Sequence, residues 1–387
     1  MLGFALFFCA CTQKQVPPAP TPSVEVVAPS EEIEPPIPPV VPMRSVHFSA
    51  TGDNLIHDGI YLQAKSRAGG EGYDFTALYE NVAPFYQQFD VNWINQETLI
   101  TDELPPSSYP TFCSPAALGK AAYDAGFRVF SLANNHIYDK GALGIAATRR
   151  FWGEMPSDAL TTGLFEGEAD YDNIPMHEVN GVTIAYLAYT QYTNGIPIPA
   201  GAEAHVIMTS EEMLLERQIR RAKTLADFVV VGVHWGNEGS HIPTDAQRAL
   251  AAKFAEWGAG AIIGTHPHVV QPIEWLDASD GRRVPVAYSL GNFVSSQAAA
   301  PNMIGLVFSF EITENEAGGF DALNPTATPV ITHYDANYKN IREYLYRDYT
   351  NALAAVHGTR ARFPTFNRAY IEKILSDTIS NEFLRLD

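Results

Sequence analysis

Short apolar runs alternate with segments of helical spacing through most of this chain, and the alternation restricts the folds it can adopt. The runs typical of buried strands lie at 44–50, 90–95, 127–133, 182–190, 227–234, 259–266, 284–290 and 305–312. The segments with helical spacing lie at 76–89, 114–126, 210–226 and 244–258. Because strands that alternate with helices build βαβ units, the pattern predicts the α/β class.

The composition of the chain changes near residue 313. From there to residue 329, Asn, Gly, Pro and Thr interrupt the alternation of strands and helices. Beyond that point, apolar and polar stretches indicate one further strand and two helices. We therefore expect a main domain over residues 43–312 and a C-terminal extension over residues 313–387 that packs on it.

Side chains that bind metal ions follow the ends of several predicted strands. They are Asp53, Glu97, Asn135 with His136 beside it, His234, His266 and His268. Ligands of open α/β sheets bind beyond the carboxyl ends of the strands, so we expect these groups at one edge. A mixed set of oxygen and nitrogen donors favours Mn, Fe or Zn over Mg or Ca.

Each of these residues also has a plain structural explanation. Gly52-Asp53 alone is a common turn, the Asn-Asn-His run can cap a loop, and a lone His234 at a strand end is more often structural. The pair His266 and His268 is a stronger signal, because one intervening residue directs both side chains to the same side of an extended segment. Their joint recurrence at strand ends favours a shared metal site.

Six segments, in this order, resemble the motif blocks of the CapA family of poly-γ-glutamate capsule proteins. They are GDNLIHDG (52–59), NQETLI (95–100), LANNHIYDKG (132–141), GVHWGNEGSHIPTDAQRALA (232–251), GAGAIIGTHPHVVQPIEW (258–275) and YSLGNF (288–293). The blocks span roughly residues 44 to 293, and GTHPHVVQ with SLGNF is the most specific pair. The family is similar to calcineurin-like metallophosphoesterases. The resemblance therefore implies a four-layer αββα sandwich of the metallo-dependent phosphatase type.

The resemblance also implies a set of metal ligands for one or two divalent ions, Mn, Fe or Zn. Asp53 matches the first carboxylate, and Glu97 resembles the acid that bridges the ions or binds the second one. The remaining ligands it implies are Asn135, His234, His266 and His268, the last for metal or for a phosphate oxygen. Thr98 stands where relatives often have Asn, and the usual Asp-x-His opening is absent because His57 is out of register. Both departures imply a weakened site.

The resemblance implies a catalytic role for His136, and the positions of nearby residues indicate further roles. His136 matches the general acid of an Asn-His pair, and Asp139 either orients His136 or caps the following helix. The residues expected to line the cleft and bind substrate are Trp235, Glu238 and Asn292, with His241 either beside them or exposed.

The N-terminus, MLGFALFFCAC, is an apolar run too short to span a bilayer as a helix, which needs ~20 residues. Phe8-Cys9-Ala10-Cys11 is similar to a bacterial lipobox, although the Leu and the preceding basic residues of that pattern are missing. We predict a lipoprotein signal segment over residues 1–11 and lipidation at Cys11, with a plain signal peptide as the alternative. Residues 12–42 are rich in Pro and lack aromatic side chains, which predicts a disordered linker.

Charge and cysteine content narrow the function classes. The net charge of −19 disfavours nucleic acid as a partner. Once Cys9 and Cys11 are assigned to the signal and the lipid, Cys113 has no partner for a disulfide. We expect the chain at the extracellular face of the cytoplasmic membrane, held by its lipid, or secreted if the lipobox interpretation is wrong.

Three functions are consistent with this sequence. The first is poly-γ-glutamate capsule synthesis or export at the cell surface, in a complex with a capsule synthetase and with the polymer or a phosphoester as ligand. The second is a secreted metallophosphodiesterase that acts on cell-wall or nucleotide substrates. The third is a lipoprotein that binds a ligand in the same cleft without turnover. His136 favours an enzyme, since a scaffold needs no general acid.

Overall fold

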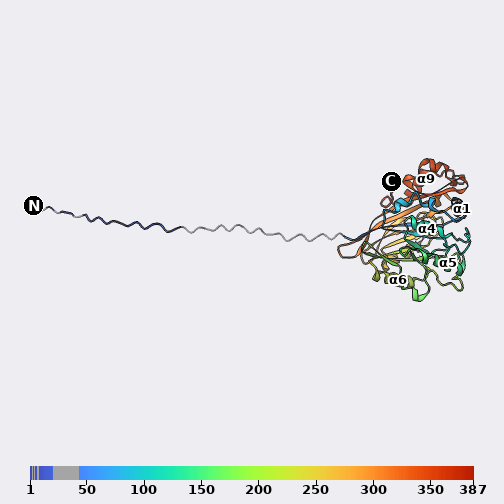
Figure 1. Cartoon of the computed structure of the whole chain (residues 1–387), viewed down its shortest axis with the longest axis horizontal. Coiled ribbons are helices and arrows are strands. Elements are labelled where there is room, and N and C mark those ends of the chain that lie inside the picture. Colours follow the sequence, from blue (N-terminus) through green and yellow to red (C-terminus); the bar gives the residue numbers. More distant parts are fainter. Residues whose placement is uncertain (2, 4, 7, 21–42) are drawn as a thin grey trace. The chain divides into compact units, whose positions relative to one another are not determined.

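The computed structural model describes residues 1, 3, 5, 6, 8–20 and 43–387, in two units, Met1–Pro42 and Met43–Asp387 (Figure 1). The described residues of the first unit form no helix or strand, and Cys11 is exposed. Parts of the predicted signal segment (residues 2, 4 and 7) and of the predicted linker (21–42) lie outside the described residues. Within the described ranges, no helix is long and apolar enough to cross a membrane.

The second unit contains an eight-stranded sheet in the order β14-β13-β12-β1-β2-β3-β4, with β11 also paired to β1. Strands β1 to β4 run parallel, and β12 to β14 are antiparallel to their neighbours. The strands are β1 (Ser45–Asn54), β2 (Val91–Asn95), β3 (Val129–Ser131), β4 (Leu160–Thr162), β11 (Asn292–Val294), β12 (Ile304–Glu314), β13 (Phe320–Asp335) and β14 (Lys339–Leu345).

A six-stranded sheet follows the order β5-β6-β7-β8-β10-β9. Its four central strands are parallel, and β5 and β9 are antiparallel edges. The strands are β5 (Met176–Val179), β6 (Val182–Thr190), β7 (Phe228–His234), β8 (Ala261–Thr265), β9 (Ile273–Asp277) and β10 (Arg283–Ala287). The central strands are apolar on both faces because both faces are covered, as buried parallel sheets require.

The two sheets pack face to face through large apolar side chains. The ring of Phe310 on β12 lies 5.0 Å from that of Phe48 on β1 and 6.1 Å from that of Phe228 on β7. Gly232 on β7 makes room for Trp93 on β2, since a Cβ there would lie 2.9 Å from the indole ring. The close approach of the sheets therefore depends on a small residue opposite a large one.

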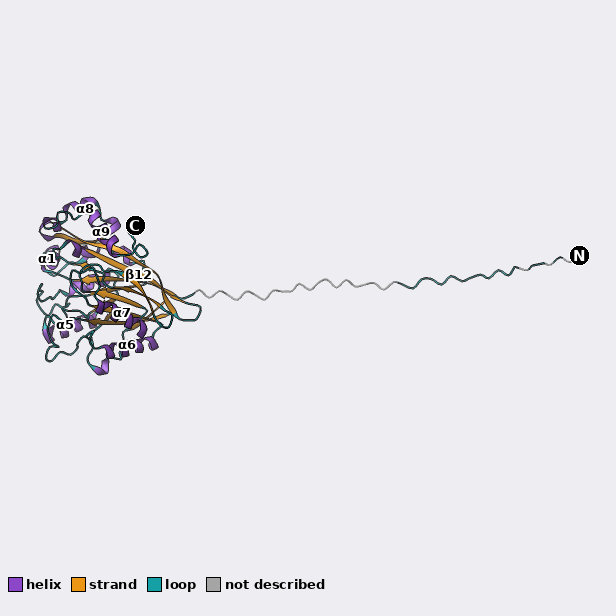
Figure 2. Ribbon diagram, turned by 180° about the vertical axis from the view of Figure 1, so that it is seen from behind, coloured by secondary structure: helices purple, strands orange, loops and turns teal. Residues whose placement is uncertain are grey.

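Helices cover the outer faces of both sheets, as Figure 2 shows for α6 and α7 on one side of the strands. The packing of Trp152 on α5 against Phe130 on β3, with 4.3 Å between the rings, fixes one outer layer. The helices are α1 (Asp58–Arg67), α2 (Thr76–Tyr79), α3 (Ala83–Tyr86), α4 (Ala116–Asp124), α5 (Gly141–Glu154), α6 (Glu212–Leu225), α7 (Asp245–Trp257), α8 (Asn351–Val356) and α9 (Arg368–Thr378). Short 3₁₀ turns lie at Glu168–Asp170, Ala300–Met303, Ala336–Tyr338, Tyr346–Asp348 and Gly358–Ala361. This arrangement confirms the predicted α/β class and the αββα order of layers.

Helix α7 shows how local sequence signals set the elements. Thr244 and Gln247 form a capping box at its start, in which each side chain bonds the backbone of the other residue. Gly258 ends the helix with a φ of 127°, a conformation that residues with a Cβ rarely adopt. The helix predicted at 244–258 is therefore observed with both of its ends at the expected residues.

The C-terminal part of the chain continues the eight-stranded sheet. Two strands follow residue 313, β13 and β14, where composition indicated one, and the expected boundary at 312/313 falls inside β12. A tight turn at Ala336–Tyr338, with φ of 60° at Asn337 and 54° at Tyr338, reverses the chain. That turn allows Lys339–Leu345 to pair with β13 as a hairpin. Helices α8 and α9 come after it.

Candidate metal centre

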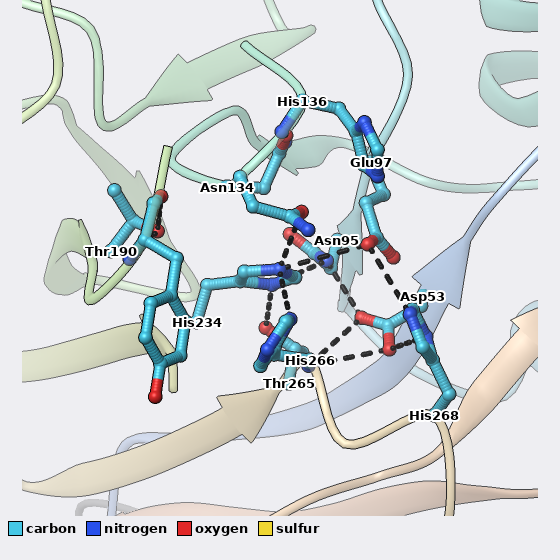
Figure 3. A network of polar contacts seen from close by, with 12 residues as sticks. Asp53, Asn95, Glu97, Asn134, His136, Thr190, His234, Thr265, His266 and His268 are labelled. Carbon is cyan, nitrogen blue, oxygen red and sulfur yellow. Dashed lines mark hydrogen bonds and ion pairs between the residues drawn. The ribbon is translucent and has the colours of Figure 1, made fainter. Parts of the chain in front are cut away.

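The carboxyl ends of the parallel strands in both sheets meet at one buried centre (Figure 3). Asp53 lies at the end of β1, Glu97 two residues beyond β2, and His234 is the last residue of β7. His266 follows β8 directly, and all four side chains are buried. Hydrogen bonds and close polar contacts join them to Asn135 and His268. The six residues predicted as metal ligands therefore lie together.

The carboxylate of Glu97 is the least satisfied group of this centre. It is fully buried, yet among the described residues neither of its oxygens accepts a hydrogen bond. Its Oε1 lies 3.6 Å from His234 Nε2 and 3.8 Å from His268 Nε2. Glu97, His266 and His268 each offer a ligand atom, and these atoms lie within 4.8 Å of one another. Because a buried carboxylate without partners is costly, this donor set fits a divalent cation.

The His-Pro-His segment reaches the centre by a route that the sequence did not indicate. We expected an extended segment, but the chain bends after β8, with φ of 98° at His266 and 59° at His268. Positive φ is uncommon for residues with a Cβ and tends to persist where surrounding structure holds it, as at functional sites. Both imidazoles face the centre because the backbone turns twice, not because side chains alternate along a strand.

The ionisation of the histidines follows from burial and from their neighbours. Burial, reinforced by His266 and His268, holds the pKa of His234 well below its usual range. Burial likewise lowers the pKa of His266 to about 4. Both rings are therefore neutral at pH 7, the state in which an imidazole binds metal.

The pKa values of Glu97 and His268 are shifted upward instead. Burial, together with the charge of Asp53, raises the pKa of Glu97 well above its usual value. Burial disfavours a charged His268, but Glu97 and Asp53 outweigh it and raise the pKa of His268 to about 9. The raised pKa values of Glu97 and His268 mean that these two groups hold protons which a bound cation would displace.

Asp53 is held at the centre by its neighbours and by the backbone. Its Oδ1 accepts a hydrogen bond from Asn95 Nδ2 at 2.8 Å, and its Oδ2 lies 3.1 Å from His268 Nδ1. The preceding Gly52 permits this approach, because a Cβ there would lie 1.8 Å from the carbonyl oxygen of Gly291. Only glycine can be accommodated at position 52. Asp53 and the loop at Gly291 therefore lie in a fixed, close approach.

Asn292, predicted to bind substrate, contacts His268. Its Oδ1 lies 3.1 Å from His268 Nδ1, and its Nδ2 donates to Gln297 Oε1 at 2.8 Å. The structure thus places Asn292 where it orients His268, and a contact with substrate stays a prediction.

His136 has the surroundings of a general acid. Its Nδ1 lies 2.8 Å from Asp139 Oδ2, which also accepts the backbone N–H of Phe112 at 2.5 Å. The ring of Phe112 packs edge-on against His136, with 4.7 Å between centroids. Among the described residues no side chain caps the start of α5, so of the two roles considered for Asp139 the geometry favours the orienting one. A carboxylate at Nδ1 directs the other nitrogen, Nε2, to act on a ligand.

The other residues expected in the cleft take separate positions. Trp235 is buried on the helix side of the sheet, where its Nε1–H donates to Tyr288 O at 2.9 Å and its ring stacks with Phe254. Trp235 therefore does not lie with the six residues predicted as metal ligands. Glu238 is exposed, and its negative charge makes a small contribution to the raised pKa values of Glu97 and His268. His241 Nδ1 lies 2.8 Å from Val270 O, a structural contact.

Sequence reasoning missed several residues around the centre. Asn95 contacts Asp53 and keeps a buried Oδ1 that bonds to none of the described residues. Asn95 is the first residue of the Asn-x-Glu block, so the sequence contained a signal that it belongs to the centre. Thr265 Oγ1 lies 3.0 Å from His234 Nδ1 and so sets which nitrogen of that ring faces the centre. His57, although out of register, lies with its ring 5.2 Å from Phe112.

Thr98, the departure from the family pattern, does not point into the centre. Its hydroxyl accepts from Gln96 Nε2 at 2.9 Å and lies 2.8 Å from Ser114 Oγ. Gln96 in turn accepts from Asn54 Nδ2 at 2.7 Å. These side chains form a buried hydrogen-bonded network next in sequence to Asp53 and Glu97, and the Thr98 hydroxyl is one of its members.

Residues 47–297 match a protein family described as bacterial capsule synthesis protein PGA_cap. The chain belongs to this family. The predicted resemblance to CapA proteins is thereby confirmed.

Two curated relatives of this PGA_cap chain are named for capsule synthesis. It is 33% identical over 214 residues to the PGA biosynthesis protein CapA of Bacillus subtilis (strain 168), covering 55% of this chain and 53% of the relative. It is 34% identical over 227 residues to the capsule biosynthesis protein CapA of Bacillus anthracis, covering 56% and 53%. The chain thus spans about half the length of the curated relatives it matches.

Two solved structures are distantly similar to this chain. A novel phosphatase from Mycoplasma pneumoniae matches with a TM-score of 0.47 and 12% identity, over 75% of this chain and 94% of that one. A hypothetical protein from Thermus thermophilus matches with a TM-score of 0.44 and 15% identity, over 73% and 99%. Neither likeness is close enough to support an inference about function.

Proposed function

We propose that this chain is a metal-dependent phosphoester hydrolase that acts at the cell surface in capsule synthesis. The observation that carries the proposal is Glu97, a buried carboxylate whose two oxygens bond to none of the described residues and which faces His266 and His268. A divalent cation would satisfy that carboxylate and bind the lone pairs of the two imidazoles. Asn95 Oδ1, also buried and unbonded within the described part of the chain, supports the same inference.

The residues that would hold the cation are the clustered donors Asp53, Glu97, Asn135, His234, His266 and His268. Mn, Fe or Zn in this set would act as a Lewis acid toward a phosphoryl oxygen and supply a nucleophile at neutral pH. The chain contributes a site closed to bulk water, since Asp53 and Glu97 are fully buried and His266 is 5% exposed. Electrostatic attraction to a phosphoryl group is strengthened in such surroundings.

His136 would supply the proton for the leaving group. Asp139 accepts the Nδ1–H of His136, so the ring can carry its second proton on Nε2 and pass it to the departing alkoxide. Phe112 fixes both partners, through its backbone N–H to Asp139 and its ring against His136. The two residues therefore keep one orientation while a substrate enters and leaves.

The capsule role rests on the relatives, whose names tie them to PGA and capsule biosynthesis. Lipidation of Cys11 and a linker over residues 12–42 would place the catalytic unit outside the cytoplasmic membrane, beside a capsule synthetase. The ligand would be poly-γ-glutamate or a phosphoester. Because a chain of net charge −19 repels a polyanion, contact through the cationic metal centre is the route we propose.

A phosphodiesterase assay tests the enzymatic part. The purified chain, loaded with Mn²⁺, should hydrolyse bis(p-nitrophenyl) phosphate, and His136→Ala should lower kcat by about 10²- to 10⁴-fold without loss of metal. His47→Ala is the matched control, because His47 is exposed near the amino end of β1, whereas the centre lies at the carboxyl ends of the strands. Equal rates for the wild type and His136→Ala would refute hydrolysis by this mechanism and favour a binding role.

The capsule part is tested in the cell. A strain that lacks this gene should regain its surface polymer when the wild-type chain is supplied, and should not regain it with His136→Ala. Full restoration by His136→Ala would show that capsule production needs the protein but not its catalysis.

A further inference from the structure

Asn194 lies at the tip of a tight turn in the loop that follows β6. The backbone N–H of Ile196 donates to Thr193 O at 2.9 Å, and φ is 54° at Asn194 and 72° at Gly195. Two positive φ values are those of a type I′ turn, for which Asn-Gly is the preferred sequence. The sequence Thr-Asn-Gly-Ile therefore sets an amide side chain at the tip of a rigid turn.

The base of this loop is tied to the strand that carries His234. Gln191 N–H donates to His234 O at 2.8 Å, and Gln191 Oε1 accepts the backbone N–H of Gly236 at 2.9 Å. The next residue, Tyr192, packs its ring 5.0 Å from that of His266. The turn is consequently held in a fixed position relative to the imidazoles of the metal centre.

The Asn194 amide contacts the Asn-His pair that comes from the other sheet. Asn135 Nδ2 donates to Asn194 Oδ1 at 3.2 Å, and Asn194 Nδ2 lies 3.3 Å from His136 Nδ1. His136 Nδ1 has a shorter contact with the carboxylate of Asp139, at 2.8 Å, so the ring proton belongs there. The bond to Asn135 is thus the contact through which Asn194 acts.

A primary amide carries an oxygen on one side and an NH₂ group on the other. An acceptor that binds the NH₂ group therefore turns the oxygen to the opposite side. With Nδ2 bonded to Asn194, Asn135 presents Oδ1 to the centre, 3.0 Å from His234 Nε2. An Asn135 amide turned round would present N–H groups there, and these cannot bind a cation. The contact with His234 does not fix this choice by itself, because its Nε2 can donate or accept according to the tautomer.

We propose that Asn194 is a positioning residue of the metal centre, which fixes the Asn135 amide with its oxygen toward the ion. The inference rests on the proposed function, because it assumes that the centre binds a cation. In this proposal the loop after β6 of the six-stranded sheet orients Asn135, a ligand that follows β3 of the eight-stranded sheet. Residues that orient metal ligands typically change metal affinity 10- to 100-fold when they are replaced.

The test is the affinity of the full chain for Mn²⁺, measured by calorimetric titration after removal of bound metal. Asn194→Gly removes the amide without straining the turn, since glycine accepts a φ of 54°. We expect it to weaken Mn²⁺ binding about 10- to 100-fold and to leave the melting temperature of the metal-free chain unchanged. Asn194→Asp keeps an acceptor oxygen toward Asn135 and should restore the binding.

A double-mutant cycle with Asn135→Ala separates positioning from other effects. If Asn194 acts through Asn135, then Asn194→Gly should weaken binding no further once Asn135 is Ala. Asn324→Gly is the matched control, because Asn324 is exposed on β13 with a φ of 52°, and it should bind Mn²⁺ as the wild type does.

Two results would overturn the inference while the proposed function stands. One is an Asn194→Gly chain that binds Mn²⁺ with wild-type affinity. The other is an equal loss of Mn²⁺ affinity on Asn194→Gly whether residue 135 is Asn or Ala. A wild-type chain that binds neither Mn²⁺ nor Zn²⁺ nor Fe²⁺ would instead contradict the proposed function and this inference together.

Discussion

Replacing Glu97 by Gln should stabilise the metal-free chain and weaken its response to metal. The substitution keeps the shape of the side chain but removes a buried carboxylate that accepts no hydrogen bond from the described residues, while Asp53 stays 3.1 Å from His268 and balances its charge. Such a group costs about 1–3 kcal/mol. At roughly 2 °C per kcal/mol for a domain of this size, the melting temperature of the metal-free chain should rise by ~2–6 °C at pH 8.

The gain should depend on pH in a defined direction. The pKa of Glu97 is raised in the folded chain by burial and by Asp53, so the folded state holds its proton more tightly than the unfolded state does. The stability that this proton contributes is complete below the unfolded pKa of ~4.3 and is lost as the pH rises through the folded pKa. The difference between Glu97→Gln and the wild type should therefore be small at pH 5 and largest at pH 8.

Metal should cancel most of the difference between the two proteins or reverse their order. Mn²⁺ at 100 times its Kd stabilises a folded chain by about 2.7 kcal/mol, and the wild type should gain this while Glu97→Gln gains much less. Scanning calorimetry at pH 5 and pH 8, with and without Mn²⁺, provides the four values needed for each protein.

Glu343 on β14 supplies the matched control for this experiment. It is also fully buried, and both of its oxygens lack a bonded partner within the described ranges. Thr332, its neighbour across the strand pair, donates its hydroxyl to Phe293 O instead. Glu343→Gln should stabilise the metal-free chain similarly and leave the response to Mn²⁺ intact. A Glu97→Gln protein that melts below the wild type without metal at pH 8 would refute the reasoning.

Three further outcomes are expected. Gly52→Ala should destabilise the chain by about 1–3 kcal/mol or more in a urea unfolding titration, because the new Cβ meets the Gly291 carbonyl oxygen; wild-type stability would contradict the fixed approach of β1. Asp139→Asn should lower phosphodiesterase kcat by roughly 10- to 100-fold at unchanged metal content, and an unchanged rate would remove Asp139 from the mechanism. Cys11→Ser should move the chain from the membrane fraction to the medium on cell fractionation; if Cys11→Ser stays with membranes, the lipid is not the anchor.

Much of the centre was predictable because it depends on strand ends. Parallel strands of one sheet place their carboxyl ends at one edge, so Asp53 and Glu97, at the ends of β1 and β2, could be assigned to the same region from the order of the elements alone. The alternation of strands and helices indicated only the α/β class, and the packing of two sheets was expected from the family resemblance. The family blocks added the roles expected of these residues.

Other features depend on contacts between segments far apart in the chain. The bends at His266 and His268 exist because surrounding structure holds two positive φ values, which residue types other than glycine do not signal. Asn194 was missed although its Asn-Gly turn is a local signal, since nothing local shows that the turn reaches Asn135. Only one of the two C-terminal strands was predicted, because Asn, Pro and Thr interrupt the first ten residues of β13, 320–329, which did not resemble a strand.

Metal content tests the central claim most directly. The chain should be purified without chelator and its Mn, Fe and Zn measured per chain by elemental analysis, beside Glu97→Gln and the control His47→Ala. We predict one or two ions per chain in the wild type and in His47→Ala, and a clear loss in Glu97→Gln. A wild-type chain that holds none of these metals, even after reconstitution with each of them, would contradict the assignment of this buried centre as a metal site.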